Sequence, residues 1–279
     1  MKIERFKKNF SKGVIYFFII VPAIIWLLPL VSTVFLSFKT EKEIMVEGAW
    51  AFPKTLNFET IKTTFLRLSP YIKNSIIITV PAAFFSVLIS ALGAYVLARK
   101  SFKGKNIILF YFLSGLMIPS AVCLVPLFKL MQGWGLYNTY MAQILTNISF
   151  GIPICTFVLR NFFITIPKSI EEAAIIDGCS DFMVFRKIIL PISAATVATM
   201  VGFQFIWIWN TLVWGLVLAI NEKVQPIMVG IVNLKGSYEM AWNVSCAAAL
   251  ISMILPMIIF FSLQKYLAKG LFAGAGIKG

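Results

Sequence analysis

Six long stretches with almost no charged residues dominate this sequence of 279 residues. A helix needs about 20 apolar residues to cross the hydrocarbon core of a membrane, and each stretch reaches that length. A soluble domain could not bury so much apolar surface, given a mean hydropathy of +0.89 and 13% charged residues. We therefore predict an all-α membrane protein whose single domain, residues 1–279, contains six transmembrane helices. These spans lie at approximately 13–38, 74–98, 106–128, 139–163, 190–218 and 241–264.

The length and proline content of the stretches refine this prediction. Because lipid offers no hydrogen-bond partners and the stretches are too long for barrel strands, the spans should be helices. Two crossings within 188–221 would need about 40 apolar residues and a turn, so we expect one tilted or kinked helix there. Seven prolines in the apolar stretches can kink their helices, either to line a cavity or without functional consequence. They are Pro22, Pro29, Pro81, Pro119, Pro126, Pro153 and Pro256.

The distribution of positive charge predicts the orientation. Lysines and arginines cluster at 2–12, 99–105 and 265–278, and the positive-inside rule places such clusters in the cytoplasm. Both termini, and the loop between the fourth and fifth spans, are therefore expected on the cytoplasmic side. Membrane lipid is the expected counter-charge for the net charge of +14, and no nucleic-acid partner is expected. The first stretch is too long for a signal-peptide core and should remain as a span.

Several kinds of chemistry have no support in the sequence. Histidine is absent, which removes the commonest general base and metal ligand. No G-x-x-x-x-G-K-[ST] loop is present, and the four cysteines show no metal-binding spacing. We therefore expect no enzymatic activity, no catalytic residue, no metal site and no cofactor in this chain.

The predicted cytoplasmic loop at 167–191 has an unusual composition. Four of the eleven acidic residues of the chain fall within 171–181. Ser169 is suited to cap a short helix, with Glu172 closing a capping box, and Gly178 is suited to end it. Ser180 or Asp181 can cap a second helix that ends near Pro191. The loop could rest on lipid headgroups, but acids facing an anionic leaflet make a protein partner the better hypothesis.

The loop also matches the pattern E-A-A-x3-G-x9-I-x-L-P. The matching residues are Glu172, Ala173, Ala174, Gly178, Ile188, Leu190 and Pro191. This pattern resembles the cytoplasmic EAA loop of ATP-binding-cassette (ABC) importer permeases, which couples the permease to its ATPase. The stretches 74–80, 93–106, 209–218 and 263–279 are similar to the smaller, six-span permease of maltose-type carbohydrate importers. Thr211 is a departure, because relatives often have glutamate there.

The resemblance implies the architecture of a type I ABC importer permease in a bacterial or archaeal cell (inner) membrane. It implies that the chain forms half of a pathway for a sugar or oligosaccharide. The partners would be a homologous second permease, a dimeric ABC ATPase that binds ATP and Mg²⁺, and an extracytoplasmic solute-binding protein. It also implies that the tail at 270–279 extends towards the ATPase, although a frayed terminus would be simpler. The sequence is also compatible with an importer of a non-sugar solute, and with an ATP-independent channel or scaffold.

One stripe in the fifth span is a candidate for the substrate path. Phe203, Trp207, Asn210 and Trp214 recur at helical spacing, with Gln204 beside them. Aromatic rings and amides suit a passing sugar. The same stripe could instead pack against other spans, with Asn210 hydrogen-bonded across a helix interface.

Overall fold

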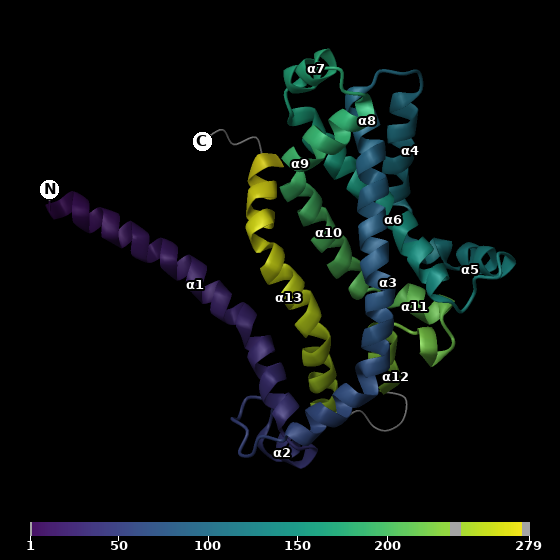
Figure 1. Ribbon diagram of the computed structural model, residues 1–279. Helices are drawn as coiled ribbons and strands as arrows, with labels where there is room; N and C mark the ends of the chain where they lie inside the picture. Colours follow the sequence, from purple (N-terminus) through teal and green to yellow (C-terminus); the bar gives the residue numbers. More distant parts are fainter. Residues whose placement is uncertain (1, 235–240, 275–279) are drawn as a thin grey trace. The chain divides into compact units, whose positions relative to one another are not determined.

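The computed structural model describes residues 2–234 and 241–274, and all regular structure in these ranges is helical (Figure 1). The predicted all-α class is confirmed. The chain forms two compact units, one comprising residues up to Leu68 with Asn233–Met253, the other Ser69–Val232 with the residues from Ile254 onward. Residues 275–279 of the tail that was expected to extend towards an ATPase lie outside the described residues.

The first unit contains helices α1 (Lys2–Phe38), α2 (Glu41–Glu47), the beginning of α3 (Phe58–Arg99) and the beginning of α13 (Trp242–Gly274). The side chain of Thr40 caps α2, since its Oγ1 accepts a hydrogen bond from the backbone N–H of Glu43. The fully buried Lys39 donates from Nζ to the carbonyl of Gly48 at 2.9 Å. The segment between α1 and α3 therefore has a defined structure.

The second unit contains the rest of α3 and α13 and the elements between them. These elements are α4 (Lys105–Met117), η1 (Ser120–Cys123), α5 (Leu124–Gly133), α6 (Tyr140–Thr165), α7 (Lys168–Ile176), α8 (Asp181–Val184), η2 (Phe185–Ile189), α9 (Leu190–Ile192), α10 (Ala194–Trp209), α11 (Val213–Leu218), η3 (Glu222–Val224) and α12 (Ile227–Leu234). Helices α7 and α8 lie at the end of this unit where α3 ends, and α5 and α11 lie towards the other end (Figure 1).

Four helical segments of the described chain are long and apolar enough to cross a membrane, and two bent helix pairs raise the number to six. The four are Val14–Phe38, Phe58–Arg99, Tyr140–Thr165 and Trp242–Tyr266. The bent pairs are Lys105–Met117 with Ser120–Gly133, at 95°, and Asp181–Ile192 with Ala194–Trp209, at 77°. The chain is thus a multi-pass membrane protein.

Two predicted spans are interrupted instead of forming single helices. The span predicted at 106–128 breaks at Pro119, where Ile118 has the extended ψ of 117° that a residue preceding proline favours. The span predicted at 190–218 bends at Ser193, and its main helix α10 ends at Trp209. The segment predicted as one fifth span thus bends near its start, and its continuation to 218 is a separate helix, α11.

Hydrogen bonds from α3 and α6 hold the return segment 219–226 in place. Asn74 Nδ2 on α3 donates to the carbonyls of Glu222 and Gln225, at 3.0 and 2.9 Å. Tyr140 Oη and Gln143 Nε2 on α6 donate to the carbonyls of residues 223 and 224. These bonds satisfy backbone groups that a helix would otherwise pair internally, which allows an irregular segment at this position.

The orientation of the chain in the membrane stays a prediction, and cysteine labelling checks it. In a cysteine-free background, Gln132→Cys should react with a membrane-impermeant maleimide in intact cells, whereas Ser169→Cys should react only after permeabilisation. Both positions are exposed, and α7, which carries Ser169, lies at the end of the second unit where α3 ends, whereas α5, which carries Gln132, lies away from that end. Labelling of Ser169→Cys in intact cells would reverse the predicted orientation.

Candidate functional site

The loop at 167–191 folds into two short helices joined by a tight turn. Gly178 has a φ of +82°, so it occupies the predicted left-handed position. Ser180 Oγ accepts from the backbone N–H of Met183 at 3.4 Å, which confirms Ser180 as the cap of α8. The capping prediction for Ser169 is wrong, because α7 begins at Lys168 with Pro167 before it and has no side-chain cap. Pro167 has an extended ψ of 131°, so the helix begins at the next residue and Ser169 lies inside its first turn, where it cannot act as the cap.

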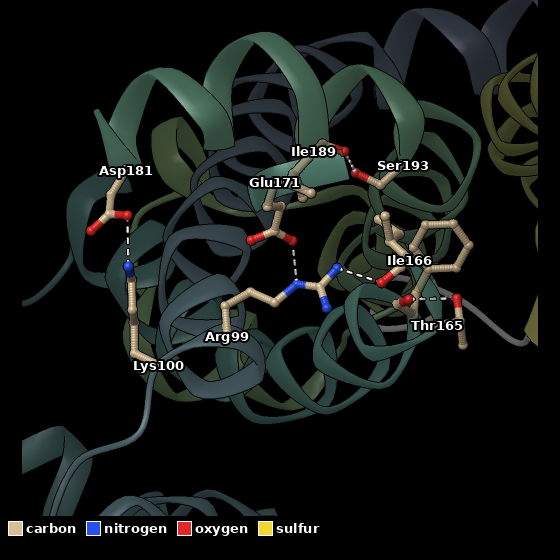
Figure 2. Close-up of polar contacts among 9 residues, drawn as sticks. Arg99, Lys100, Thr165, Ile166, Glu171, Asp181, Ile189 and Ser193 are labelled. Carbon is tan, nitrogen blue, oxygen red and sulfur yellow. Dashed lines mark hydrogen bonds and ion pairs between the residues drawn. The ribbon is translucent and has the colours of Figure 1, made fainter. Parts of the chain in front are cut away.

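A buried ion pair fixes α7 to the end of α3 (Figure 2). Arg99 is the last residue of α3, and its Nε lies 2.5 Å from Glu171 Oε1. The same guanidinium donates from Nη2 to the carbonyl of Ile166 at 2.7 Å. The two charged side chains are only 5% and 10% exposed. One arginine thus holds both the end of α6 and the first turn of α7.

A second ion pair fixes α8 to the residue that follows α3. Lys100 Nζ lies 2.6 Å from Asp181 Oδ1, and the side chains are 42% and 57% exposed. Exposed pairs of this kind contribute about 0–1 kcal/mol, so this contact is the weaker of the two. Two consecutive basic residues therefore contact the two helices of the loop separately (Figure 2).

The surroundings of Glu171 have opposing effects on the pKa of its carboxyl group. Burial raises the pKa of the Glu171 carboxyl, while the charges of Arg99 and Lys100 lower it. Breaking a buried ion pair by removing one partner costs about 3–5 kcal/mol, because the other charge is left uncompensated. Arg99 and Glu171 are thus expected to be needed together.

Apolar contacts seat the loop on the membrane helices beneath it. Ala174, Val184, Phe185 and Ile189 belong to one buried cluster with residues of α3, α6 and α10. Those residues include Ala91, Tyr95, Leu159, Phe163 and Met200. The rings of Tyr95 and Phe185 are 5.3 Å apart. A displacement of the loop would therefore disturb the packing of three membrane helices.

The opposite face of the loop is uncovered and carries apolar as well as charged residues. Ile176 is 85% exposed, and Ile175 and Phe182 are also exposed. Glu172 and Ala173 lie on the same uncovered side of α7, next to these apolar residues. Exposed apolar groups beside charged residues are typical of a protein-interaction surface.

The residues that matched the EAA pattern thus divide between the two faces. Glu172, Ala173 and Gly178 are exposed, whereas Ala174 is packed into the buried cluster. Ile188 and Leu190 are partly buried against that cluster, and Pro191 is exposed.

The connection from the loop into α10 is bent, and a side-chain hydrogen bond stabilises it. Ser193 is fully buried, and its Oγ donates to the carbonyl of Ile189 at 2.7 Å (Figure 2). The preceding segment, η2, is a wider π-helical turn, a feature found frequently at functional sites. A movement of α8 and α9 would therefore be transmitted directly to α10.

The candidate pathway residues do not form the predicted stripe. Helix α10 ends at Trp209, so Trp214 lies on α11, where it is buried against Phe150 with ring centroids 4.8 Å apart. Gln204 is 2% exposed and donates from Nε2 to Gly151 O at 3.4 Å and to Cys155 Sγ at 3.1 Å. The burial of Trp214 and Gln204 within the chain favours a packing role for these two residues.

The remaining three candidates lie on the uncovered side of α10. Phe203 and Trp207 are exposed, and their rings stack with centroids 6.0 Å apart. Asn210 is exposed and donates from Nδ2 to its own helix at Ile206 O, 2.8 Å away. These residues are therefore available to a solute or to another chain.

The residues that anchor the loop were not identified from the sequence. Arg99 and Lys100 indicated only the orientation, and Glu171 only a helix-terminal acid. Two basic residues at the predicted cytoplasmic end of one span and a concentration of acids in another predicted cytoplasmic loop were the available signal. Among the described residues, no group of three or more His, Cys, Asp or Glu is placed to hold a metal ion.

The fold and the loop define a multi-span membrane protein with a loop at one end that ion pairs anchor to the membrane helices. Residues 86–273 match the model of the family "Binding-protein-dependent transport system inner membrane component", and the chain belongs to this family. It is 35% identical to the probable ABC transporter permease protein YurM of Bacillus subtilis, over 90% of this chain and 83% of YurM.

Two further comparisons extend over nearly the whole chain. The chain is 30% identical to the glucose import system permease protein GlcU of Saccharolobus solfataricus, over 95% of each protein. It shares its fold with a chain of a bacterial ABC transporter that imports alginate, with a TM-score of 0.76 and 21% identity. That match covers 91% of this chain and 95% of the other. The resemblance to ABC importer permeases and the permease architecture are confirmed.

Proposed function

We propose that this chain forms half of the translocation pathway of an ABC importer for a sugar or oligosaccharide. The anchored loop carries this proposal, because it presents Ile176 and Phe182 to a partner while ion pairs hold it to the membrane helices. The sequence offers no phosphate-binding loop of its own, so ATP hydrolysis must occur in another chain. The names of two similar proteins, a glucose import permease and an alginate importer, support a carbohydrate as the solute.

The proposed assembly has four kinds of component. This permease pairs with a homologous second permease, and the loop at 167–191 docks on a dimeric ATPase that binds ATP and Mg²⁺. An extracytoplasmic binding protein delivers the sugar. Closure of the ATPase dimer moves the loop and, through α8 and α9, helix α10, so that the pathway opens alternately to each side.

Reconstitution tests this function directly. Proteoliposomes with this chain, its neighbouring permease, the ATPase and the cognate binding protein should accumulate a radiolabelled sugar only when ATP is present. An ATPase variant that lacks the phosphate-binding lysine provides the control. Sugar entry without ATP that stops at the outside concentration would favour a channel, and ATP-dependent uptake of amino acids but not sugars would favour a non-sugar importer.

The uncovered side of α10 supplies a prediction about the pathway. Trp207→Ala should weaken uptake unequally across a series of sugars, because an exposed ring can stack on a sugar face and each sugar differs in its apolar area. A loss of about 0.5–1.5 kcal/mol of stacking corresponds to a roughly 2- to 13-fold change in relative preference. Competition for uptake between two labelled sugars measures this preference.

Asn210→Ala provides a second test of the same surface. Its amide lies on the uncovered side and also bonds to its own helix, so a shift in preference would support a lining role. An equal loss for every sugar, or loss of the second permease on purification, would place Trp207 and Asn210 in the packing between subunits.

A further inference from the structure

The loop is attached to the membrane helices through α3 as well as through the two helices that it connects in sequence. The chain leaves α6 at Thr165 and enters α10 at Ala194, yet the charged contacts of the loop go to the end of α3. One of these contacts is buried and the other is exposed. Helix α3 is therefore an additional support for the loop.

Arg99 joins the end of α3 to the junction between α6 and α7, and we call its contacts with Glu171 and Ile166 the bracket. Its guanidinium meets Glu171 on α7 through Nε and the carbonyl of Ile166 through Nη2, so it spans the junction between α6 and α7. The guanidinium is planar and rigid, so its hydrogen bond to the carbonyl of Ile166 and its ion pair with Glu171 have a fixed relative arrangement, whereas the ammonium group of lysine acts as a point charge. The bracket therefore fixes the direction of α7 in addition to its distance from α3.

The neighbouring acids Glu171 and Glu172 lie in different environments, which indicates different roles. Glu171 is buried against Arg99, whereas Glu172 is exposed on the side of Ile176. The EAA pattern contains Glu172 but not Glu171, so the pattern alone does not reveal the bracket. Tyr95 on α3 and Phe185 on η2 add an apolar contact between α3 and a later segment of the loop.

We propose that Arg99 and Glu171 are positioning residues that make α7 and the end of α3 move as one body when the ATPase acts on the loop. This proposal rests on the proposed function, because it requires an ATPase docked at α7. Lys100 and Asp181 form an exposed contact that supports α8, and their loss leaves the bracket intact. Force on the loop then reaches α3 through Arg99, separately from the covalent route into α10.

The first test measures the movement in the wild-type complex. Spin labels at Leu92 on α3 and Ser169 on α7, both exposed, are introduced in a cysteine-free background of the complete importer. Double electron–electron resonance should give the same distance with and without a non-hydrolysable ATP analogue. A distance that changes with the analogue would overturn the proposal, whatever the variants show.

The second test measures coupling in variants. Arg99→Lys and Glu171→Gln should each raise the ATP hydrolysed per sugar imported by about fivefold, a change typical of one residue in a coupling network. The double variant should raise it no further, because both changes break one contact. The matched control Lys100→Ala, at the exposed pair, should leave the ratio and the label distance unchanged.

The outcomes separate this proposal from the proposed function. If the ATPase does not purify with the wild-type permease, the proposed function fails. If the ATPase purifies with every variant and the ratio stays at the wild-type value in Arg99→Lys and Glu171→Gln, only the bracket fails. If a variant protein does not accumulate in the membrane, the distance between the labels in the wild-type complex alone tests the bracket.

Discussion

Gly178→Val should abolish most of the transport while leaving the membrane helices intact. Gly178 has a φ of +82°, and a β-carbon added there would meet no atom within 4 Å, so the expected strain is conformational and not steric. A left-handed conformation costs an L-residue about 1–2 kcal/mol, which lowers the population of the docking-competent turn about 5- to 30-fold. Uptake should fall by a similar factor, with normal abundance in the membrane and reduced ATPase association.

Gly135→Val is the matched control for this result. Gly135 also has a positive φ, +68°, and open space around its β-carbon position, but it lies in the turn between α5 and α6. The same local strain there should leave ATPase association unchanged. Wild-type uptake by Gly178→Val would show that the turn has no part in coupling, and loss of membrane insertion would show that the loop is needed for folding.

Gly151→Ala should destabilise the second unit more than Gly178→Val does. A β-carbon at Gly151 would lie 2.9 Å from Gln204 Oε1 and 3.0 Å from Ser86 Cβ, so α3, α6 and α10 approach one another closely around this position. Overpacking of this kind costs about 1–3 kcal/mol. The thermal unfolding midpoint of the purified protein in detergent, and its abundance in membranes, should both fall.

Two further variants make this prediction specific. Gly93→Ala is a helical control on α3, where nothing lies within 4 Å of the added β-carbon, and it should keep the wild-type midpoint. Gly151→Ala combined with Gln204→Ala should regain part of the lost stability, because the second change removes the Oε1 atom that crowds the new β-carbon. This oxygen has no hydrogen-bond partner among the described residues, so its removal breaks no bond of its own. If the double variant is no more stable than Gly151→Ala, the contact with Gln204 does not limit the packing.

The membrane helices followed from the sequence because the length of an apolar stretch is a direct consequence of membrane thickness. The break at Pro119 did not follow, although this proline was a candidate for a kink. A proline within a span can kink a helix or end it, and the outcome depends on which neighbouring groups satisfy the freed backbone. The same limit applies to α10, whose end at Trp209 is stabilised by side chains such as Asn210 that bond back to their own helix.

In the loop, two local features were predicted correctly, the cap at Ser169 was not, and the long-range contacts were not predicted at all. The turn at Gly178 and the cap at Ser180 depend on a few neighbouring residues, and both were identified. The ion pair of Arg99 with Glu171 joins residues far apart in the sequence, so only the packing of α3 against the loop reveals it. The burial of Gln204 was hidden for the same reason, because helical periodicity does not show which face of a span another helix covers.

Photo-crosslinking from Ile176 tests the central claim most directly. With p-benzoylphenylalanine at Ile176, the most exposed apolar residue of α7, illumination of membranes that contain the complete importer should link this chain to the ATPase. The same probe at Trp134, which is exposed and directly follows α5, should give no such product. A crosslink to the ATPase from Trp134 and none from Ile176, in membranes that still import sugar with ATP, would contradict the account.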